Sequence, residues 1–396
     1  MYMKNILFVI DSLTCGGAEK SLVSLLNNLD YSKYNVDLLL MKRGGEFENF
    51  LSREVNILES PKYFRYLSGD KKIDIKNKVI YIKHRLITSI RLRINNNRKH
   101  SIDSEQIVYE SIKNILEPIN KKYDVAIAYS QGLPTYFVSE IVNADKKLSW
   151  INCDYVKAKY DKELDNKYYN NINKIIVVSD FIYNSISKMK YDYKSKLKII
   201  LDIVDPKLIN SMAIDNRAME LENVDEFKIL TVGRLAYVKG YDLAVKVAIL
   251  LKESNYKFKW FIIGEGPERN YIEKLIKENN LENEVILLGV KSNPYPYMKK
   301  CDLYVQPSRT EGFGLTVVEA KILGNVIVST NFDTANKLIN NNIDGIITEK
   351  NENSIYINIK NLIDNKKYYN RIKDNVISLK PYNSTGEIEK FYEEIY

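Results

Sequence analysis

Two glutamates bound a glycine-rich stretch in the C-terminal half of the chain, which reads Glu311-Gly312-Phe313-Gly314-Leu315-Thr316-Val317-Val318-Glu319. The glycines predict a sharp loop, and a helix is expected to begin near Leu315. The first amide groups of a helix have no partner within it, so they favour an anion such as phosphate. Glu319 would lie about 6 Å further along the axis, too deep for a cap but able to accept hydrogen bonds from two ribose hydroxyls.

The same two carboxylates could serve as the acid and base of a glycosidase, but both would then flank one bond. Glu311 and Glu319 are instead placed to bracket a diphosphate, with Glu311 on its sugar side. Two cations in an earlier loop, Arg234 after Gly233 and Lys239 before Gly240, could clamp that diphosphate with a planar fork and a compact charge. Taken alone, these two cations are more typical of surface ion pairs.

Two further glycine turns follow apolar runs, Gly16-Gly17-Ala18-Glu19 and Ile263-Gly264-Glu265-Gly266. In the first, two glycines let the backbone approach an anion at a helix start, although a tight strand-to-helix turn explains them equally well. The second is similar to a dinucleotide fingerprint, but Arg269 replaces its third glycine. We expect that turn to line a ligand cleft, and an NAD-dependent oxidoreductase is disfavoured.

Short apolar runs alternate with longer helical patterns along the chain, which is typical of parallel sheets covered by helices. The expected strands are 6–10, 36–41, 125–129, 148–151, 175–178, 229–232, 260–263, 285–288, 303–305, 326–329 and 345–348. The expected helices include 18–29, 241–251, 269–278 and 316–323. Ligands bind at the carboxyl ends of such strands, and each motif above follows a predicted strand.

The alternating pattern runs twice, on either side of a polar stretch without strands at about 206–226. We therefore predict an α/β protein of two Rossmann-like domains with a cleft between them. The N-terminal domain would cover residues 1–208 with a basic insertion at 61–100, and the C-terminal domain residues 209–380. Residues 381–396 are expected to form a helix that packs back on the N-terminal domain.

Composition disfavours several classes of chemistry. His84 and His100 are the only histidines in the sequence, which disfavours His-dependent nucleophilic catalysis. Cys15, Cys153 and Cys301 form no pair typical of a disulfide or a zinc site, so we expect no metal and no cofactor. No stretch approaches the roughly 18 apolar residues of a bilayer span, and the run at 6–10 is too short for a signal peptide. The sequence therefore predicts a cytoplasmic protein.

Together these motifs resemble the retaining glycosyltransferases of the GT-B fold, specifically family 4, the glycosyl transferases group 1. The resemblance rests on the turn at 16–19, Gly233-Arg234 with Lys239-Gly240, Ile263-Gly264-Glu265-Gly266, Leu288-Gly289, and Pro307 to Gly314 with Glu319. It covers about residues 225–350 in the C-terminal half. The N-terminal half matches chiefly at its first turn, as is usual when that half binds a variable acceptor.

The resemblance implies a role for each matching residue. Arg234 and Lys239 would bind the diphosphate and stabilise the leaving group, while Glu311 would contact hydroxyls of the donor sugar. The other donor contacts would come from Gly16, Gly17, Gly233, Gly264, Val290, Phe313, Gly314, Leu315 and Glu319, the last holding the ribose. Such enzymes keep the anomeric configuration without an obvious protein nucleophile. Preorganised cations and amides would stabilise the leaving group in place of a metal.

The acceptor side departs from the family pattern. Many relatives have Trp-Ile-His-x-Asp at a strand end of the N-terminal half, where this chain has Trp150-Ile151-Asn152-Cys153-Asp154. Asn152 cannot act as a base, which leaves Asp154 as the polar candidate. A helix cap or a loop turn would explain Asp154 equally well.

The positive charge of the chain is concentrated in one segment. Residues 61–100 hold twelve Lys or Arg residues against two Asp, in a chain whose net charge is +8. On a helical wheel one broad face, interrupted by Lys83 and Arg93, carries Val79, Ile80, Ile82, Leu86, Ile87, Ile90 and Ile94. The segment could hold an anionic membrane surface or a lipid-diphosphate acceptor, or it could be a solvated helical hairpin. Nucleic acid is disfavoured because no binding motif accompanies the charge.

The sequence thus predicts transfer of a hexose or N-acetylhexosamine from a nucleoside-diphosphate sugar to a surface glycan or lipid-linked acceptor, peripherally at the cytoplasmic membrane. UDP is preferred over GDP on the resemblance alone. One alternative is a non-catalytic GT-B partner subunit, disfavoured because Arg234, Lys239, Glu311 and Glu319 are all present. The other is a UDP-sugar epimerase of the same fold, disfavoured because histidine is scarce.

Overall fold

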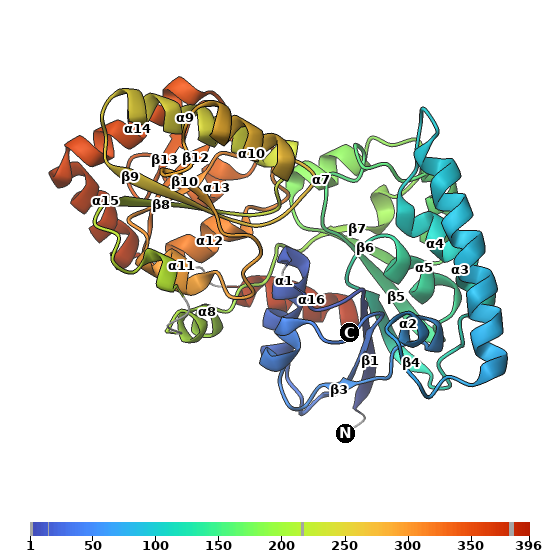
Figure 1. The fold of residues 1–396 in the computed structure, drawn as a ribbon. Coiled ribbons are helices and arrows are strands. Elements are labelled where there is room, and N and C mark those ends of the chain that lie inside the picture. The colour runs from blue at the N-terminus through green and yellow to red at the C-terminus, as the bar shows by residue number, and fades with distance from the viewer. Residues whose placement is uncertain (1–2, 15, 215–217, 380–383) are drawn as a thin grey trace. The chain divides into compact units, whose positions relative to one another are not determined.

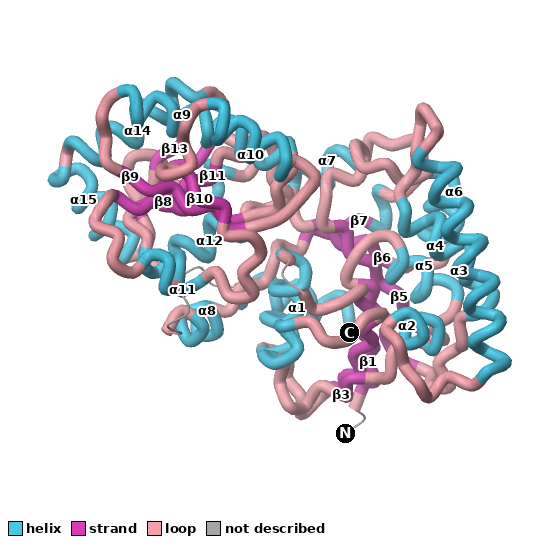
Figure 2. The backbone as a smooth tube through the Cα atoms, in the orientation of Figure 1, coloured by secondary structure: helices cyan, strands magenta, loops and turns pink. Residues whose placement is uncertain are grey.

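The structure is a computed structural model that describes residues 3–14, 16–214, 218–379 and 384–396. Cys15 and the start of the helix expected from residue 381 lie outside these ranges. The chain divides into two compact units: unit 1 is Met1–Ile203 with Ser384–Tyr396, and unit 2 is Val204–Asn383. Each unit has one parallel sheet with helices packed against it (Figures 1 and 2).

The described residues of unit 1 form a sheet in the order β3-β2-β1-β4-β5-β6-β7. Its strands are β1 Lys4–Ile10, β2 Tyr34–Leu40, β3 Asn56–Ile57, β4 Tyr123–Ala128, β5 Ala144–Ile151, β6 Lys174–Val177 and β7 Leu197–Ile199. Its helices are α1 Gly17–Asn27, α2 Lys62–Leu67, α3 Ile75–Asn96, α4 Ser104–Ile112, α5 Leu133–Glu140, α6 Lys162–Tyr169, α7 Asp180–Ile186 and α16 Thr385–Ile395. The strand order reverses between β1 and β4, which is where ligands bind in open α/β sheets.

The described residues of unit 2 form a sheet in the order β10-β9-β8-β11-β12-β13. Its strands are β8 Phe227–Val232, β9 Phe258–Ile263, β10 Val285–Leu287, β11 Leu303–Gln306, β12 Val326–Thr330 and β13 Ile346–Thr348. Its helices are α8 Pro206–Met212, α9 Tyr241–Glu253, α10 Arg269–Glu278, α11 Tyr295–Lys300, α12 Leu315–Ile322, α13 Ala335–Leu338, α14 Glu352–Asp364 and α15 Lys366–Ser378. Here the order reverses between β8 and β11, the two strands that lead into the Arg234 and Glu311 loops.

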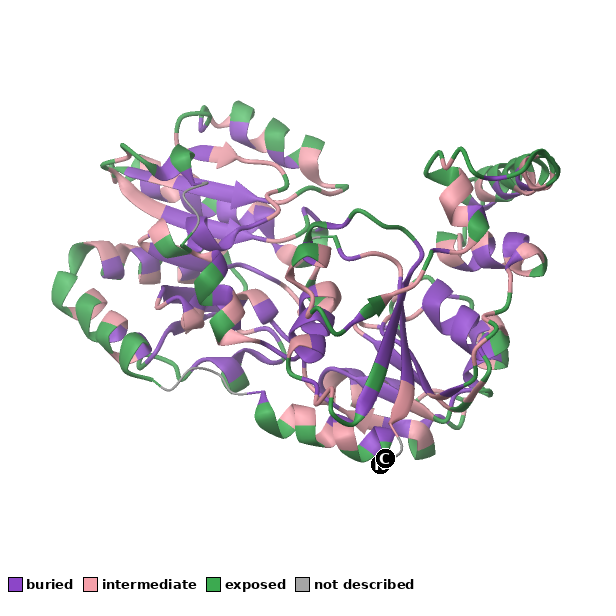
Figure 3. Cartoon of the chain, turned by 90° about the horizontal axis from the view of Figure 1, so that it is seen from below, coloured by how far each residue is buried: buried purple, intermediate pink, exposed green. Residues whose placement is uncertain are grey.

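Burial on both faces explains why the central strands are continuous apolar runs. In β1, the five residues from Ile6 to Ile10 are each no more than 2% exposed. Figure 3 shows the strands of both sheets mostly in the buried class, with exposed residues on the outer faces of the helices. Each strand that the sequence predicted is present in the structure.

Two strands escaped the sequence prediction, β3 and β7, which lie at the two edges of the unit 1 sheet. An edge strand pairs on one side only and can be short, so it lacks the apolar run of a central strand. β3 is two residues long and β7 three. Their sequences carry too little periodicity to be recognised.

The C-terminal helix α16 belongs to unit 1, although it follows unit 2 in the chain. Phe391 stacks on Phe8 of β1, with ring centroids 6.0 Å apart, and lies 6.2 Å from Trp150 of β5. Tyr392 stacks on Tyr34, and its hydroxyl accepts a hydrogen bond from the Asp30 amide at 2.9 Å. Aromatic contacts thus fix α16 to the sheet of unit 1.

Candidate functional site

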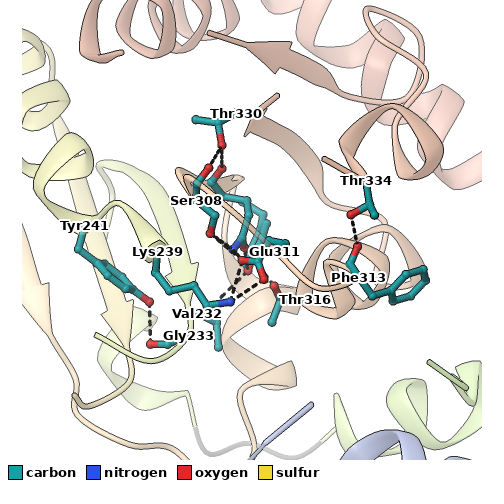
Figure 4. Close-up of polar contacts among 12 residues, drawn as sticks. Val232, Gly233, Lys239, Tyr241, Ser308, Glu311, Phe313, Thr316, Thr330 and Thr334 are labelled. Carbon is teal, nitrogen blue, oxygen red and sulfur yellow. Dashed lines mark hydrogen bonds and ion pairs between the residues drawn. The ribbon is translucent and has the colours of Figure 1, made fainter. Parts of the chain in front are cut away.

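In unit 2, Lys239 and Glu311 meet at the carboxyl edge between β8 and β11 (Figure 4). The Lys239 Nζ lies 2.7 and 2.6 Å from the two carboxylate oxygens of Glu311. Glu311 Oε1 also accepts hydrogen bonds from Gln306 Nε2 at 2.8 Å and Ser308 Oγ at 2.6 Å. The Glu311 side chain is 8% exposed, so these donors hold a nearly buried carboxylate in one orientation.

Gly240 brings the two loops this close together. It has a φ of +69°, and a Cβ there would lie 2.0 Å from the carbonyl oxygen of Pro307. Beside it, Arg309 donates two hydrogen bonds of 2.7 Å to Asp242 and lies 4.1 Å from the centre of the Tyr237 ring. Arg309, part of the motif that carries the resemblance, therefore joins the two loops.

Arg234 lies in the loop after β8, directly after Gly233, and it is exposed. Within the described ranges it has no acidic partner, in contrast to Lys239 and Arg309. Its guanidinium retains its donors for an anion at this edge of the sheet.

The loops after β8, β9 and β10 are tied together by their backbones. The Gly233 amide donates to the Ile263 carbonyl at 2.9 Å, and the Gly264 amide donates to the Gly289 carbonyl at 2.8 Å. Gly264 has a φ of +148°, and a Cβ there would lie 1.9 Å from the carbonyl oxygen of Gly233. At Gly264, the turn that was predicted to line a cleft packs closely against the loop that contains Gly233.

We expect Gly264→Ala to lower the free energy of unfolding by about 2–4 kcal/mol, because the methyl group meets backbone rather than a movable side chain. Urea unfolding followed by circular dichroism measures this loss. Gly386→Ala is the matched control, since a Cβ at Gly386 meets nothing within 4 Å and alanine favours the helix α16. Equal stability of the two variants would contradict the expected clash.

Helix α12 begins at Leu315, where the sequence predicted a helix start. Gly314 caps it with a φ of +97°, and a Cβ there would lie within about 3 Å of Phe332 and Leu338. Thr334 Oγ1 donates to the Phe313 carbonyl at 2.6 Å, which fixes the loop before the helix (Figure 4). The first amides of α12 therefore lie at the carboxyl edge of the sheet, where they favour an anion.

Glu319 lies inside α12 and is 1% exposed. Its Oε1 accepts a hydrogen bond from the Tyr295 hydroxyl at 2.8 Å. Tyr295 was not foreseen, since it lies on α11 and nothing in its local sequence marks it. Val290 lies in the loop after β10 and is 59% exposed.

Unit 1 holds the other predicted residues at the edge where β1, β4 and β5 end. Gly16 precedes α1, and a Cβ there would lie 2.1 Å from Glu19 Oε2, so glycine lets this carboxylate fold over the turn. Asp154 is a turn residue: its carboxylate accepts from the Lys157 amide at 3.4 Å and pairs with Lys157 Nζ at 3.1 Å. The turn interpretation accounts for its contacts.

Asn152 lies at the end of β5. Its Nδ2 donates to the Tyr129 carbonyl at 2.9 Å, and its amide nitrogen donates to Gln131 Oε1 at 3.0 Å. Its Oδ1 is buried and has no hydrogen-bond partner within the described ranges. A buried acceptor without a donor is costly, so this oxygen is suited to a hydroxyl from a ligand.

Two further carboxyl groups near this edge were not foreseen, Asp11 after β1 and Glu105 in the first turn of α4. Burial raises the pKa of Asp11 to about 7, although the Ser130 hydroxyl, 3.3 Å away, opposes the shift. Burial and the charge of Asp11 raise the pKa of Glu105 to about 8. Of these two residues, only Asp11 could have been noticed in the sequence, because it is the polar residue that ends the first apolar run.

These raised pKa values predict a stability that falls as pH rises. In the unfolded chain Asp11 loses its proton near pH 4, whereas in the folded protein it keeps the proton until about pH 7. Between these values the folded state binds more protons, so raising the pH destabilises it. Relative to Asp11→Asn, we expect the wild type to lose roughly 1–3 kcal/mol between pH 5 and pH 8. Urea unfolding of both proteins at each pH measures this, and parallel pH profiles would contradict it.

The residue types and the helices of the described ranges bear on metal binding and on membrane crossing. They contain no group of three His, Cys, Asp or Glu side chains arranged to hold a metal ion. None of their helices has both the length and the apolar character that crossing a membrane requires.

Known proteins resemble this chain in sequence over part of its length and in fold over nearly all of it. Residues 213–378, almost all of unit 2, match the family model of glycosyl transferases group 1. The Anabaena protein HepE in complex with UDP-glucose matches with a TM-score of 0.67 at 17% identity, over 98% of each chain. The fold is GT-B. A second structure with this fold is that of a TarM variant from S. aureus, with a TM-score of 0.66 at 16% identity over 99% of this chain and 100% of TarM.

The GT-B fold extends over both units, whereas the family model and the Campylobacter relative each match less than half of the chain. The chain is 33% identical over 184 residues to the N-acetylgalactosamine-N,N'-diacetylbacillosaminyl-diphospho-undecaprenol 4-alpha-N-acetylgalactosaminyltransferase of Campylobacter jejuni, covering 45% of this chain and 48% of that protein. The chain spans about half the length of the curated relatives it matches.

Proposed function

We propose that this chain is a metal-independent, retaining glycosyltransferase of family 4 that takes a hexose or N-acetylhexosamine from a nucleoside-diphosphate sugar, with UDP as the favoured nucleotide. One observation carries the proposal. The exposed Arg234, the Lys239–Glu311 pair and the N-terminus of α12 gather at the point where the unit 2 sheet reverses its strand order. Cations and helix amides at one edge favour a diphosphate.

Each group then has a role in transfer. Arg234 and the Gly314 and Leu315 amides bind the diphosphate, and their charge stabilises the leaving group as the glycosidic bond breaks. Lys239 is shared between that diphosphate and Glu311. Glu311, held by Gln306 and Ser308, accepts hydrogen bonds from hydroxyls of the donor sugar. Glu319 accepts from the ribose, and Gly233, Gly264, Phe313 and Val290 shape the nucleotide pocket. The roles of Gly16 and Gly17, which belong to unit 1, stay predictions.

The acceptor would bind unit 1, at the edge that holds Asn152. Its attacking or neighbouring hydroxyl would donate to the unpartnered Asn152 Oδ1. The contents of one solved structure and the name of one curated relative support a glycan or lipid-linked acceptor. The TarM structure contains UDP and alpha-GlcNAc-glycerol, and the Campylobacter transferase is named for a diphospho-undecaprenol-linked acceptor.

A panel of UDP-, GDP- and dTDP-sugars tests the donor. At a hundredfold excess over the dissociation constant, a bound donor stabilises the fold by about 2.7 kcal/mol, which raises the melting temperature by a few degrees. The stabilising donor is then incubated with lipid-linked acceptors in EDTA, and NMR of the product reports the anomer. Inversion of the anomeric configuration would refute the retaining mechanism. Loss of activity in EDTA would refute metal independence. Binding without any transfer would indicate a non-catalytic subunit.

We also propose that α3 attaches the protein peripherally to the anionic inner face of the cell membrane. One side of α3 packs on unit 1 through Tyr81, Thr88 and Asn95, all buried. The opposite side exposes an apolar stripe, each residue 48–80% exposed, made of Ile75, Val79, Ile82, Leu86, Ile90 and Ile94. Ile80 and Ile87, which the helical wheel placed with this stripe, are only half-exposed beside it. Figure 1 shows α3 along the outside of unit 1.

The charges of α3 agree with this role. Lys78 and Arg85 flank one side of the stripe, and Lys76 and Lys83 interrupt its other edge, while the helix itself contains no acidic residue. An interfacial helix places apolar side chains among the acyl chains and its cations beside anionic headgroups.

The double variant Leu86→Glu/Ile90→Glu tests the attachment. Each lost apolar contact is worth about 1–2 kcal/mol, so we expect at least a tenfold loss of binding to vesicles with anionic lipid. Co-sedimentation measures the bound fraction. Ile357→Glu is the matched control, because Ile357 on α14 is 60% exposed, as Leu86 is. Equal vesicle binding by both variants would show that α3 is a solvated helix.

A further inference from the structure

Unit 2 contains a pocket of about 610 Å³ that Val318, Lys321 and Ile322 of α12 help to line. It lies between α12, α13 and α15, and we call it the lysine pocket. Its volume is within the range of about 300–1,000 Å³ that is usual for small-molecule sites. None of the residues assigned above to the donor lines it, so an occupant would be a second ligand.

The lysine pocket has an apolar wall. Val318 and Ile322 contribute to it from α12, Leu338 from α13, and Ile377 from α15. Ile377 is 62% exposed although it is a large apolar side chain. Covering such a wall with an alkyl chain removes apolar surface from water, which favours binding.

The lysine pocket is also cationic. Four lysines line it, Lys299, Lys321, Lys337 and Lys373, against the single acid Asp344. Asp344 is fully buried and already bound: its carboxylate accepts from the Asn340 amide at 2.9 Å and pairs with Lys321 Nζ at 3.0 Å. Within the described ranges, Lys299 and Lys373 have no acidic partner. The positive charge of Lys299 and Lys373 is therefore uncompensated within the part of the chain that the structure describes.

We propose that the lysine pocket binds a lipid phosphate monoester, with its alkyl or prenyl chain on the apolar wall and its phosphate among the lysines. A phosphate monoester carries a charge of about −1.5 to −2 at pH 7, which matches a pocket lined by several lysines better than a singly charged carboxylate does. The ligand goes beyond the proposed function, since the residues that hold it take no part in donor binding.

The pocket is connected to the donor site through Leu338. This side chain lines the pocket, and its Cδ1 lies 2.8 Å from the position of a Cβ on Gly314, the cap of α12. The carbonyl of Leu338 also accepts a hydrogen bond from Lys321 Nζ at 2.7 Å, and Lys321 lies on α12. Occupation of the pocket therefore acts on the helix that carries Glu319, and we expect it to change the affinity for UDP.

Isothermal titration of the full chain with decyl phosphate, below its micelle concentration and without sugar nucleotide, tests the site. Decanol and inorganic phosphate are the comparison ligands. We expect decyl phosphate to bind at least about tenfold more tightly than either, and Lys299→Glu/Lys373→Glu to weaken it at least about tenfold. Lys366→Glu, on α15 but outside the pocket, is the matched control and should bind as the wild type does.

Three results would overturn the proposal. Binding of decanol as tight as that of decyl phosphate would show an apolar site without a headgroup. Binding of inorganic phosphate as tight would show an anion site without a chain. Unchanged affinity in the double variant would place the ligand elsewhere. The titration contains no sugar nucleotide. Its result can therefore be interpreted even if the proposed glycosyl transfer is not observed.

Discussion

Arg234→Ala is expected to lower kcat about 10²- to 10³-fold while the protein keeps its fold. Arg234 is the cation at the unit 2 edge that has no acidic partner within the described residues, so its charge is available to the leaving diphosphate. Removing one preorganised group that stabilises charge in a transition state usually costs this much. Initial rates with the donor that the panel identifies measure the effect.

Two companion variants isolate the cause. Arg234→Lys keeps the charge but loses the planar fork, and we expect it to recover only part of the activity. Arg371→Ala removes an exposed arginine from α15, where it lies 5.1 Å from the Tyr368 ring, and should leave kcat unchanged. If Arg234→Ala has the same kcat as the wild type, Arg234 does not stabilise the leaving group.

Glu319→Ala is expected to lower kcat/KM about 10²- to 10³-fold and to abolish discrimination between UDP and 2′-deoxy-UDP. Glu319 is 1% exposed and bound by the Tyr295 hydroxyl, so its carboxylate has one orientation. A buried group that hydrogen-bonds a substrate hydroxyl penalises the analogue that lacks it, because the group is then unpaired. Binding constants for the two nucleotides measure the discrimination directly.

The ratio of the two binding constants separates recognition from general damage. We expect the wild type to prefer UDP by about tenfold or more, and the ratio in Glu319→Ala to approach one. Tyr295→Phe removes the supporting hydrogen bond and keeps the carboxylate, so its ratio should fall only in part. A Glu319→Ala ratio equal to that of the wild type would show that the ribose is held elsewhere.

Much of unit 2 could be predicted from local sequence because its signals are local. A buried parallel strand is a continuous apolar run, and a helix start after it needs glycine and exposed amides. These rules located β8, β11 and α12, and with them Arg234, Lys239, Glu311 and Glu319. β3 and β7 were missed because these two short edge strands carry no such run.

Partners distant in the sequence could not be predicted from it. Lys239 and Glu311 were given separate roles, on the diphosphate and on the sugar, and the structure joins them through loops 72 residues apart. Tyr295 in unit 2, and Asp11 and Glu105 in unit 1, were noticed only because the fold of each unit buries their polar groups. Burial also separated the packed side of α3, with Tyr81, Thr88 and Asn95, from its exposed apolar stripe.

The sequence by itself determined the two α/β units, the strands that lead into the site and the residue types at their carboxyl ends. Tertiary structure decided which charges neutralise each other, which carboxyl groups keep their protons and where the lysine pocket lies. The physical reason is that backbone conformation and apolar periodicity are properties of neighbouring residues. Hydrogen bonding, desolvation and cavities depend on groups that only folding brings together.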